Sequence, residues 1–253
     1  MKRWTRTVGG VGALALVASL AAFTANHGPR KTALHGAWKI EATGARIIGG
    51  YGDNFAYKGD DVRPLNGSAT MTVDAEAGKA MLEINVETTD ASGPIRFSAD
   101  KSFSGKIRIV QKLDTSKMAK ARIEEDVFLH GDTGNEAPVM PTLYNYFATW
   151  GPAKIFVNGE EAVPMIGSHT MFSERSRGED GAIVNPCGAA YSPMGKMKKG
   201  FTDPKHTEFH FVAHTTKPDK NNFPPHTAWI HLNFSDVKVI EHPADEKIPY
   251  QAD

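Results

Sequence analysis

The stretch HTEFHFVAH, residues 206–214, and the stretch HTAWIHLNF, residues 226–234, decide the fold. In both, histidines alternate with large apolar side chains, and successive side chains of a β-strand point to opposite faces. One predicted face carries Phe209, Phe211, Ala213, Ala228, Ile230, Leu232 and Phe234. The opposite face carries His206, Glu208, His210, His214, Trp229, His231 and Asn233. The sequence thus predicts two strands with imidazoles on the face opposite to their hydrophobic core.

The same alternation recurs along the chain. It predicts strands at Ser68–Val73, Lys79–Glu87, Ile107–Leu113, Ile123–Leu129, Ala153–Val157 (with a partner near Ala162), His169–Glu174 and Val237–Ile240. Helix-compatible segments are short, such as residues 115–121. We therefore expect an all-β fold, an antiparallel β-sandwich or a flattened, jelly-roll-like barrel with long Gly- and Pro-rich loops, as one domain over residues 36–242. Its expected core includes Leu82, Ile84, Val86, Ile107, Ile109, Val127, Ile155, Phe209, Phe211, Ile230, Leu232 and Phe234.

Residues 1–25 have the pattern of a secretory signal peptide. Basic residues at the start precede an apolar stretch, residues 8–23, that is short for a membrane span. We expect a flexible linker over residues 26–35 and a flexible tail over residues 243–253. The mature protein is then periplasmic or secreted, with no membrane insertion after cleavage.

Charge and cysteine content exclude some classes of function. The 29 basic residues are balanced by 29 acidic ones, which argues against a nucleic-acid-binding protein held by phosphate contacts. Cys187 is the only cysteine, so no disulfide within the chain is possible. Three roles remain open for Cys187: an inert thiol, an intermolecular disulfide and a soft metal ligand.

His210 and His231 form the first candidate metal site. We expect them to lie opposite each other on the two strands, and Cβ atoms of directly opposite side chains lie about 4.5–5.5 Å apart. If the rings share an ion, their nearest nitrogens lie within about 5 Å. Glu208 and His214 on the same face extend the set. The alternative is a solvated polar face without any metal.

His130, Met140, His169 and Met171 form the second candidate site. In His169-x-Met171 on a strand, an imidazole and a thioether point to one face, and thioethers favour Cu(I). The order is His130, nine residues, Met140, twenty-eight residues, then His169-x-Met171. This order resembles that of the periplasmic Cu(I) chaperones, small β-barrels that present two His and two Met, although both spacings differ and this chain is longer. The resemblance implies a copper ligand set; the alternative for the methionines is core filling.

Long loops suggest a different class of function. Three segments resist assignment as strands, namely residues 49–66, 175–203 and 216–225, and loops of such length are often functional. Aromatic side chains of the first loop, Tyr51, Phe55 and Tyr57, could stack on a glycan or another planar ligand.

The leading hypothesis is an exported metal-binding protein, with copper first, zinc second and iron third. Imidazoles do not choose between these metals, whereas nearby methionines favour copper. Two alternatives stay open: a non-catalytic binding or assembly module for an envelope partner or glycan, and a mononuclear metal-dependent enzyme. The motifs Gly-x-Ser-x-Gly and His-Glu-x-x-His do not occur, so no catalytic residue is assigned.

Overall fold

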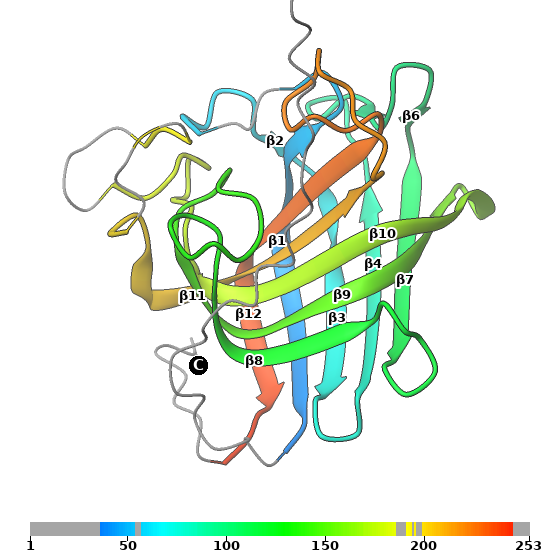
Figure 1. The fold of residues 1–253 in the computed structure, drawn as a ribbon. Coiled ribbons are helices and arrows are strands. Elements are labelled where there is room, and N and C mark those ends of the chain that lie inside the picture. The colour runs from blue at the N-terminus through cyan, green and yellow to red at the C-terminus, as the bar shows by residue number, and fades with distance from the viewer. Residues whose placement is uncertain (1–35, 54–56, 186–190, 194, 196–198, 245–253) are drawn as a thin grey trace, which may run out of the picture.

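The computed structural model describes residues 36–244, except residues 54–56, 186–190, 194 and 196–198 (Figure 1). Its strands are β1 Trp38–Gly50, β2 Arg63–Pro64, β3 Asn66–Asp74, β4 Lys79–Glu87, β5 Ile95–Arg96, β6 Ser102–Phe103, β7 Lys106–Asp114, β8 Arg122–Leu129, β9 Leu143–Val157, β10 Glu160–Arg175, β11 Asp203–His214 and β12 Trp229–Glu241. The described residues include no helix with the length and apolar character that a membrane span requires. The predicted signal peptide and linker, Phe55, Cys187 and most of the predicted tail lie outside the described residues.

The strands close into an antiparallel barrel. Its order is β10–β11–β12–β1–β3–β4–β7–β9, and β9 pairs back to β10. β8 pairs with the first part of β9, residues 143–150, whereas β7 pairs with residues 153–157. The all-β antiparallel prediction is confirmed, but the architecture is a closed barrel rather than the sandwich that we named first. Side-chain alternation is the same in both, because it reports which face is buried and not which strands pair.

β1 and the first part of β9 were not predicted from the sequence. Burial alternates in the first residues of β1, but residues 45–50 are buried on both faces. Residues 145–149 of β9 are likewise buried on both faces. A strand covered on both faces loses the polar–apolar alternation by which strands are recognised.

The hydrophobic core fills the barrel. All twelve expected core residues are buried. Eleven of them belong to the large cluster inside the barrel, whose largest side chains include Trp38 and Phe172. Val127 belongs instead to a smaller cluster with Met140, Met171 and Trp229. Since Trp229 points away from its core neighbour Ile230, the smaller cluster lies on the outside of the barrel wall.

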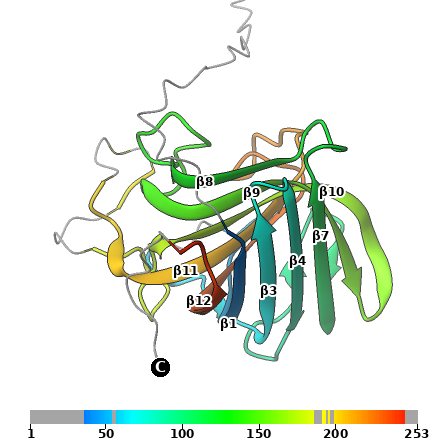
Figure 2. The ribbon, with the colours of Figure 1, turned by 90° about the horizontal axis from the view of Figure 1, so that it is seen from below.

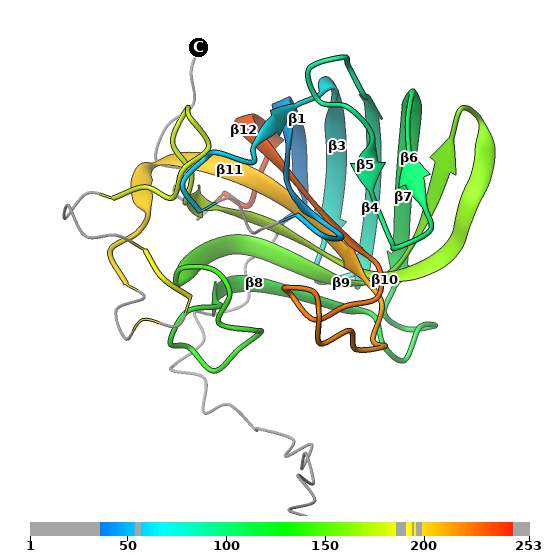
Figure 3. The same ribbon diagram turned by 90° about the horizontal axis from the view of Figure 1, so that it is seen from above.

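Long loops cover this outer face of β9, β10, β11 and β12. The connections after β1, β8 and β10 gather on one side of the barrel, as the three views show (Figures 1, 2 and 3). They are tied together by hydrogen bonds: Tyr57 Oη donates to Val139 O over 2.6 Å, and Ile183 N donates to Tyr57 O over 2.9 Å. The imidazole face that we expected on the outside of the sheet is therefore enclosed rather than solvated.

Gly49 lets the Trp229 ring lie against β1. A Cβ atom at position 49 would stand 2.3 Å from the ring atom Cη2 of Trp229. Trp229 is fully buried, so it has no room to move aside. This close approach explains a glycine in a strand interior, where glycine is otherwise unfavourable.

Candidate metal centre

Two rows of side chains cross the covered face from strand to strand. Strand register defines the first row as Trp150, His169, Val212, His231 and Gly49. The second row, one step along the strands, is Ala148, Met171, His210, Asn233 and Arg46. Glu208 and His214 share the face on β11, because they alternate with the inward side chains of that strand. Six predicted site residues therefore share one surface, and His130 and Met140 approach it from the loop after β8.

His210 and His231 are neighbours, but they are not directly opposite. His210 pairs with Asn233, and His231 pairs with Val212. The register that we predicted was wrong by two residues, because the long connection contains no tight turn that fixes its centre. The two rings meet diagonally instead, and His210 Nδ1 lies 2.9 Å from His231 Nε2. The predicted separation of less than about 5 Å is confirmed.

Glu208, His210 and His231 form a continuous hydrogen-bonded chain. His210 Nε2 donates to Glu208 Oε1 over 2.6 Å, and one proton lies between the two imidazoles. The other Glu208 oxygen accepts from Asn233 Nδ2 over 3.0 Å. The backbone N and the hydroxyl of Ser176 also donate to Oε1, over 2.7 and 2.5 Å. Glu208, His210 and His231 are all 0% exposed, so this chain is isolated from water.

The electrostatics of the chain favour an ionised Glu208. Burial by itself would raise the pKa of Glu208, but the charge and hydrogen bond of His210 and the Ser176 donors outweigh it and lower the pKa to about 2. Burial also lowers the pKa of Arg177 to about 10, and the negative charge of Glu208 opposes that shift. Arg46 reaches the same group through Asn233, whose Oδ1 accepts from Arg46 Nε over 2.6 Å. One carboxylate thus lies among two buried cations, Arg46 and Arg177.

This hydrogen bonding leaves the His210–His231 pair poorly suited to a metal ion. The facing nitrogens share a proton, and the second nitrogen of His210 is bonded to Glu208. A metal ion would have to displace these protons, since it binds only the deprotonated nitrogen. Within the described part of the chain, no group of three or more His, Cys, Asp and Glu side chains is arranged to hold a metal ion.

His130 and His169 form a second imidazole pair with different bonding. Their ring centroids lie 5.8 Å apart, and both residues are buried. The Nε2 atoms of both rings have no hydrogen-bond partner among the described residues. His130 also has a backbone φ of 61°, in the left-handed region that few residues with a Cβ adopt. Buried nitrogens without partners are rare and call for an explanation.

Both rings of this pair are held neutral. Burial lowers the pKa of His130, and burial together with the charge of His130 lowers the pKa of His169 well below its usual value. His130 Nδ1 lies 2.8 Å from the carbonyl oxygen of Ala137, which can only accept. The ring proton of His130 is therefore on Nδ1, and Nε2 presents a lone pair. An imidazole whose other nitrogen donates to a carbonyl is the usual form of a metal-ligating histidine.

Methionine and tryptophan complete the surroundings of the pair. Met140 and Met171 are 1% and 0% exposed and belong to the same small cluster. Trp150 lies edge-on to His169, with ring centroids 6.1 Å apart. The guanidinium of Arg122 covers the Trp150 ring at 3.7 Å from its centroid. The second candidate site is therefore gathered in space, in a soft and largely apolar environment.

His214 and His226, which we call the rim pair, lie at the partly exposed edge of the same face. Their rings stack with centroids 4.1 Å apart and an angle of 22° between the planes. Burial, with the charge of His214, lowers the pKa of His226 to about 4. His226 was not among the predicted site residues, because it precedes β12 and lies outside the alternation.

The tyrosines of the predicted aromatic loop are occupied by internal contacts. Tyr51 Oη donates to Asp219 over 2.9 Å, and Tyr57 Oη donates to Val139 O. Both pack against the small cluster that contains Met171. Burial is the main cause that raises the pKa of Tyr57 well above its usual range. These two side chains therefore hold the cover in place rather than line an open cleft.

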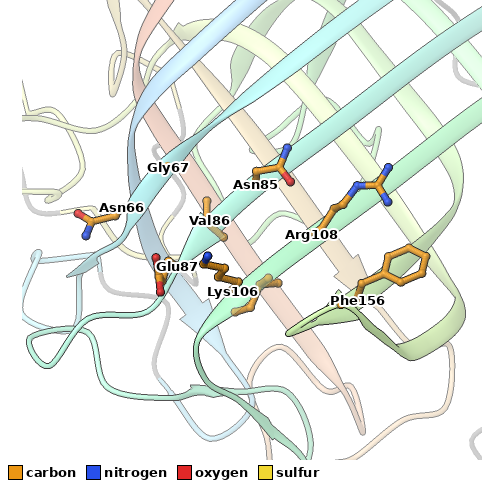
Figure 4. Close-up of a pocket in the computed structure, with 10 residues that line it drawn as sticks. Asn66, Gly67, Asn85, Val86, Glu87, Lys106, Arg108 and Phe156 are labelled. Atoms are coloured by element: carbon orange, nitrogen blue, oxygen red, sulfur yellow. The ribbon is translucent and has the colours of Figure 1, made fainter.

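A shallow groove lies on the opposite surface of the barrel, over β3, β4 and β7 (Figure 4). Its volume is about 480 Å³, and it is lined by polar side chains such as Asn85, Glu87 and Arg108 together with apolar ones such as Val86 and Phe156. Arg108 already pairs with Glu83 and stacks on Phe156. None of the imidazoles described above lines this groove.

Three polar residues of the Glu208 network were not predicted from the sequence: Ser176 and Asn233, which are bonded to Glu208, and Arg46, which is bonded to Asn233. Asn233 follows the alternation of β12 and could have been found by pairing the two strands in the correct register. Arg46 and Ser176 come from segments whose positions depend on barrel closure and loop packing, which no local pattern reports. No family model matches this chain, and neither a curated protein nor a solved structure is significantly similar to it.

Proposed function

We propose that this protein binds a copper ion through Nε2 of His130 and Nε2 of His169, with the sulfur of Met171 or Met140 nearby. The observation that carries the proposal is the pair of buried, neutral imidazoles whose Nε2 atoms have no partner among the described residues. Leaving a buried acceptor unpaired costs about 1–3 kcal/mol. A metal ion bound to both Nε2 atoms would satisfy them at once.

The separation of the two rings suits one shared ion. Two imidazoles that bind one ion through Nε2 have ring centroids about 5–6 Å apart, given metal–nitrogen bonds of about 2.0–2.1 Å. The observed 5.8 Å falls in this range. The His210–His231 rings are also close, at 5.1 Å, but their facing nitrogens are hydrogen-bonded to each other. The spacing and the bonding together favour His130 and His169.

The surroundings favour Cu(I) over zinc and iron. Thioether sulfur is a soft ligand that selects Cu(I), and Met140 and Met171 are buried in the adjacent cluster. The buried carboxylate of Glu208 is already bonded to His210, Ser176 and Asn233. A monovalent ion needs less charge compensation in a buried site than a divalent one.

The site of action is proposed to be outside the cytoplasm. The basic and apolar character of residues 1–25 supports export, and the proposed role is to hold or buffer copper in the periplasm or the external medium. A cell fractionation that finds the protein with its first residues intact in the cytoplasm would contradict this part of the proposal.

Equilibrium titration tests the copper site. Metal-free protein, purified without an affinity tag, is titrated with Cu(I), Cu(II) and Zn(II) in competition with coloured chelators. We expect one Cu(I) per chain, tighter than Zn(II). His130→Gln and His169→Gln should each lose most of the Cu(I) affinity, whereas the matched control His206→Gln should keep it, since His206 is bonded to Asp203 near the start of β11. Affinity unchanged in both His130→Gln and His169→Gln would contradict the proposal.

A further inference from the structure

We propose that the rim pair, His214 and His226, is a loading site at which a Cu(I) ion first binds before it moves inward to His130 and His169. This inference rests on the copper binding proposed above and adds to it a route and a first point of capture. It assigns to His226 a role that strand alternation alone does not suggest.

The rim pair has the exposure and geometry of a transient site. Both side chains are partly exposed, whereas His130 and His169 are 4% and 7% exposed. His214 Nδ1 lies 3.1 Å from the carbonyl oxygen of Thr215, so its Nε2 is left to face a ligand. The stacked rings are nearly parallel, so the nitrogen lone pairs lie in nearly parallel planes and do not converge on one point. One-nitrogen contacts of this kind bind an ion weakly and release it quickly.

The route from the rim pair to the buried pair is short. Gly167 lies opposite His214, and His169 lies opposite Val212, so His214 and His169 are diagonal neighbours on β11 and β10. Side chains in this relation lie about 7–8 Å apart. The charge of His214 contributes to the lowered pKa of His169, which agrees with their proximity. Gly167 puts no side chain between the strands here: a Cβ at that position would meet only His214 O, at 3.5 Å.

The transfer itself is an exchange of ligands. The ion leaves a nitrogen of the rim pair as Nε2 of His169 binds it, and Nε2 of His130 and a thioether then complete the site. Copper remains Cu(I) throughout, so no oxidant, reductant or proton donor is needed. The rim pair therefore affects how fast the protein loads and leaves the final affinity unchanged.

Stopped-flow loading tests this role. Metal-free mature protein is mixed with Cu(I) bound to bicinchoninate, and the loss of the coloured chelate is followed in time. The double variant His214→Gln/His226→Gln is compared with wild type and with His206→Gln, which removes a partly exposed imidazole of the same strand. We expect the double variant to load more slowly by about tenfold or more, because the barrier to loading loses one weak ligand contact. We expect its equilibrium affinity to stay within about twofold of wild type.

Each other outcome has a distinct meaning. A loading rate equal to that of wild type would overturn the loading site while leaving the copper site intact. A parallel loss of affinity and rate would also overturn it, because the rim pair would then belong to the final ligand set. Failure of the wild-type protein to bind Cu(I) at equilibrium would instead refute the proposed function, and the loading site with it.

Discussion

His210 Nε2 donates to Glu208 Oε1 over 2.6 Å where both side chains are completely excluded from water. A buried carboxylate is tolerated only when it is paired and hydrogen-bonded, and its removal is expensive because its buried partners lose their acceptor. Glu208 also accepts from Ser176 in the covering loop and from Asn233 on the next strand. One carboxylate thus links two strands of the barrel wall to the cover above them.

Glu208→Gln is expected to destabilise the protein by about 3–5 kcal/mol, the usual cost of removing one partner of a buried pair. Urea unfolding followed by circular dichroism measures it. The control is Glu161→Gln, which removes a partly exposed partner of Lys154 and should cost about 0–1 kcal/mol. Equal effects of the two substitutions would show that Glu208 is not structurally important.

Acidification of the metal-free protein should lower its stability in two steps. His231 is held neutral in the folded state by burial and by the charge of His210, which lower its pKa well below 6.5. In the unfolded state His231 takes up a proton near pH 6.5, whereas in the folded state it does not. The stability that depends on a neutral His231 is therefore fully present above this pH and is lost as the pH falls. The slope is about 1.4 kcal/mol per pH unit for each such proton.

The second step comes from Glu208. Its ionised form stabilises the folded state above its ordinary pKa of 4.5, and this stabilisation is lost as the pH falls toward about 2. Urea unfolding at pH 8, 6, 5 and 3 measures both steps, and stability that is constant from pH 8 to 5 would contradict the first.

Gly49→Ala is expected to destabilise the barrel by about 1–3 kcal/mol, as overpacking of a filled site does. The new methyl group would stand 2.3 Å from the Trp229 ring. The matched control is Gly167→Ala on β10, where the nearest atom would be 3.5 Å away. Urea unfolding with tryptophan fluorescence reports both the stability and the environment of Trp229. If Gly167→Ala is as destabilising as Gly49→Ala, the cause is a general effect of replacing glycine and not the contact with Trp229.

Met171→Leu should separate copper binding from folding. Leucine has a similar volume, so the metal-free protein should lose less than about 1.5 kcal/mol. An ion bound only to the native state at 100 times its Kd stabilises by about 2.7 kcal/mol, and loss of the thioether should reduce the rise in Tm that Cu(I) causes. Met81→Leu, at a partly exposed position on β4, should leave that rise unchanged. The same rise in Met171→Leu as in wild type would exclude Met171 as a ligand.

Much of the fold follows from the period of two in the sequence. Alternation located β3, β4, β7, β8 and β11 and all twelve expected core residues, because polar and apolar side chains alternate in these strands, even in β11, where residues 207–211 are buried on both faces. It failed in residues 45–50 and 145–149, which are buried on both faces and have no such alternation in their sequence. Closure of the sheet by pairing of β9 with β10 could not be predicted from the sequence, because it depends on which strands pair and not on the composition of either strand.

The candidate site was predictable in part for the same reason. Alternation assigned His210, His214 and His231 to one face, and the His169-x-Met171 spacing assigned a second pair of side chains to one face of a strand. The sequence could not show that both groups share a single surface, since this depends on β10 pairing with β11. Nor could it show that His210 is bonded to Glu208 while the Nε2 atoms of His130 and His169 have no partner in the described part of the chain, because the register and the loop cover decide this.

The pairing of β1 with β12 also determines when the covered face of the barrel is complete. Ile47 pairs with Leu232 across almost the whole length of the described chain, and such long-range pairings form late and slowly. Until residues 229–241 have been made and docked, the wall that carries His231 and Trp229 is missing and the loops have nothing to close over. If the protein is exported and binds copper as proposed above, the ion meets a finished barrel, and the compartment in which the chain folds then decides which metal it acquires.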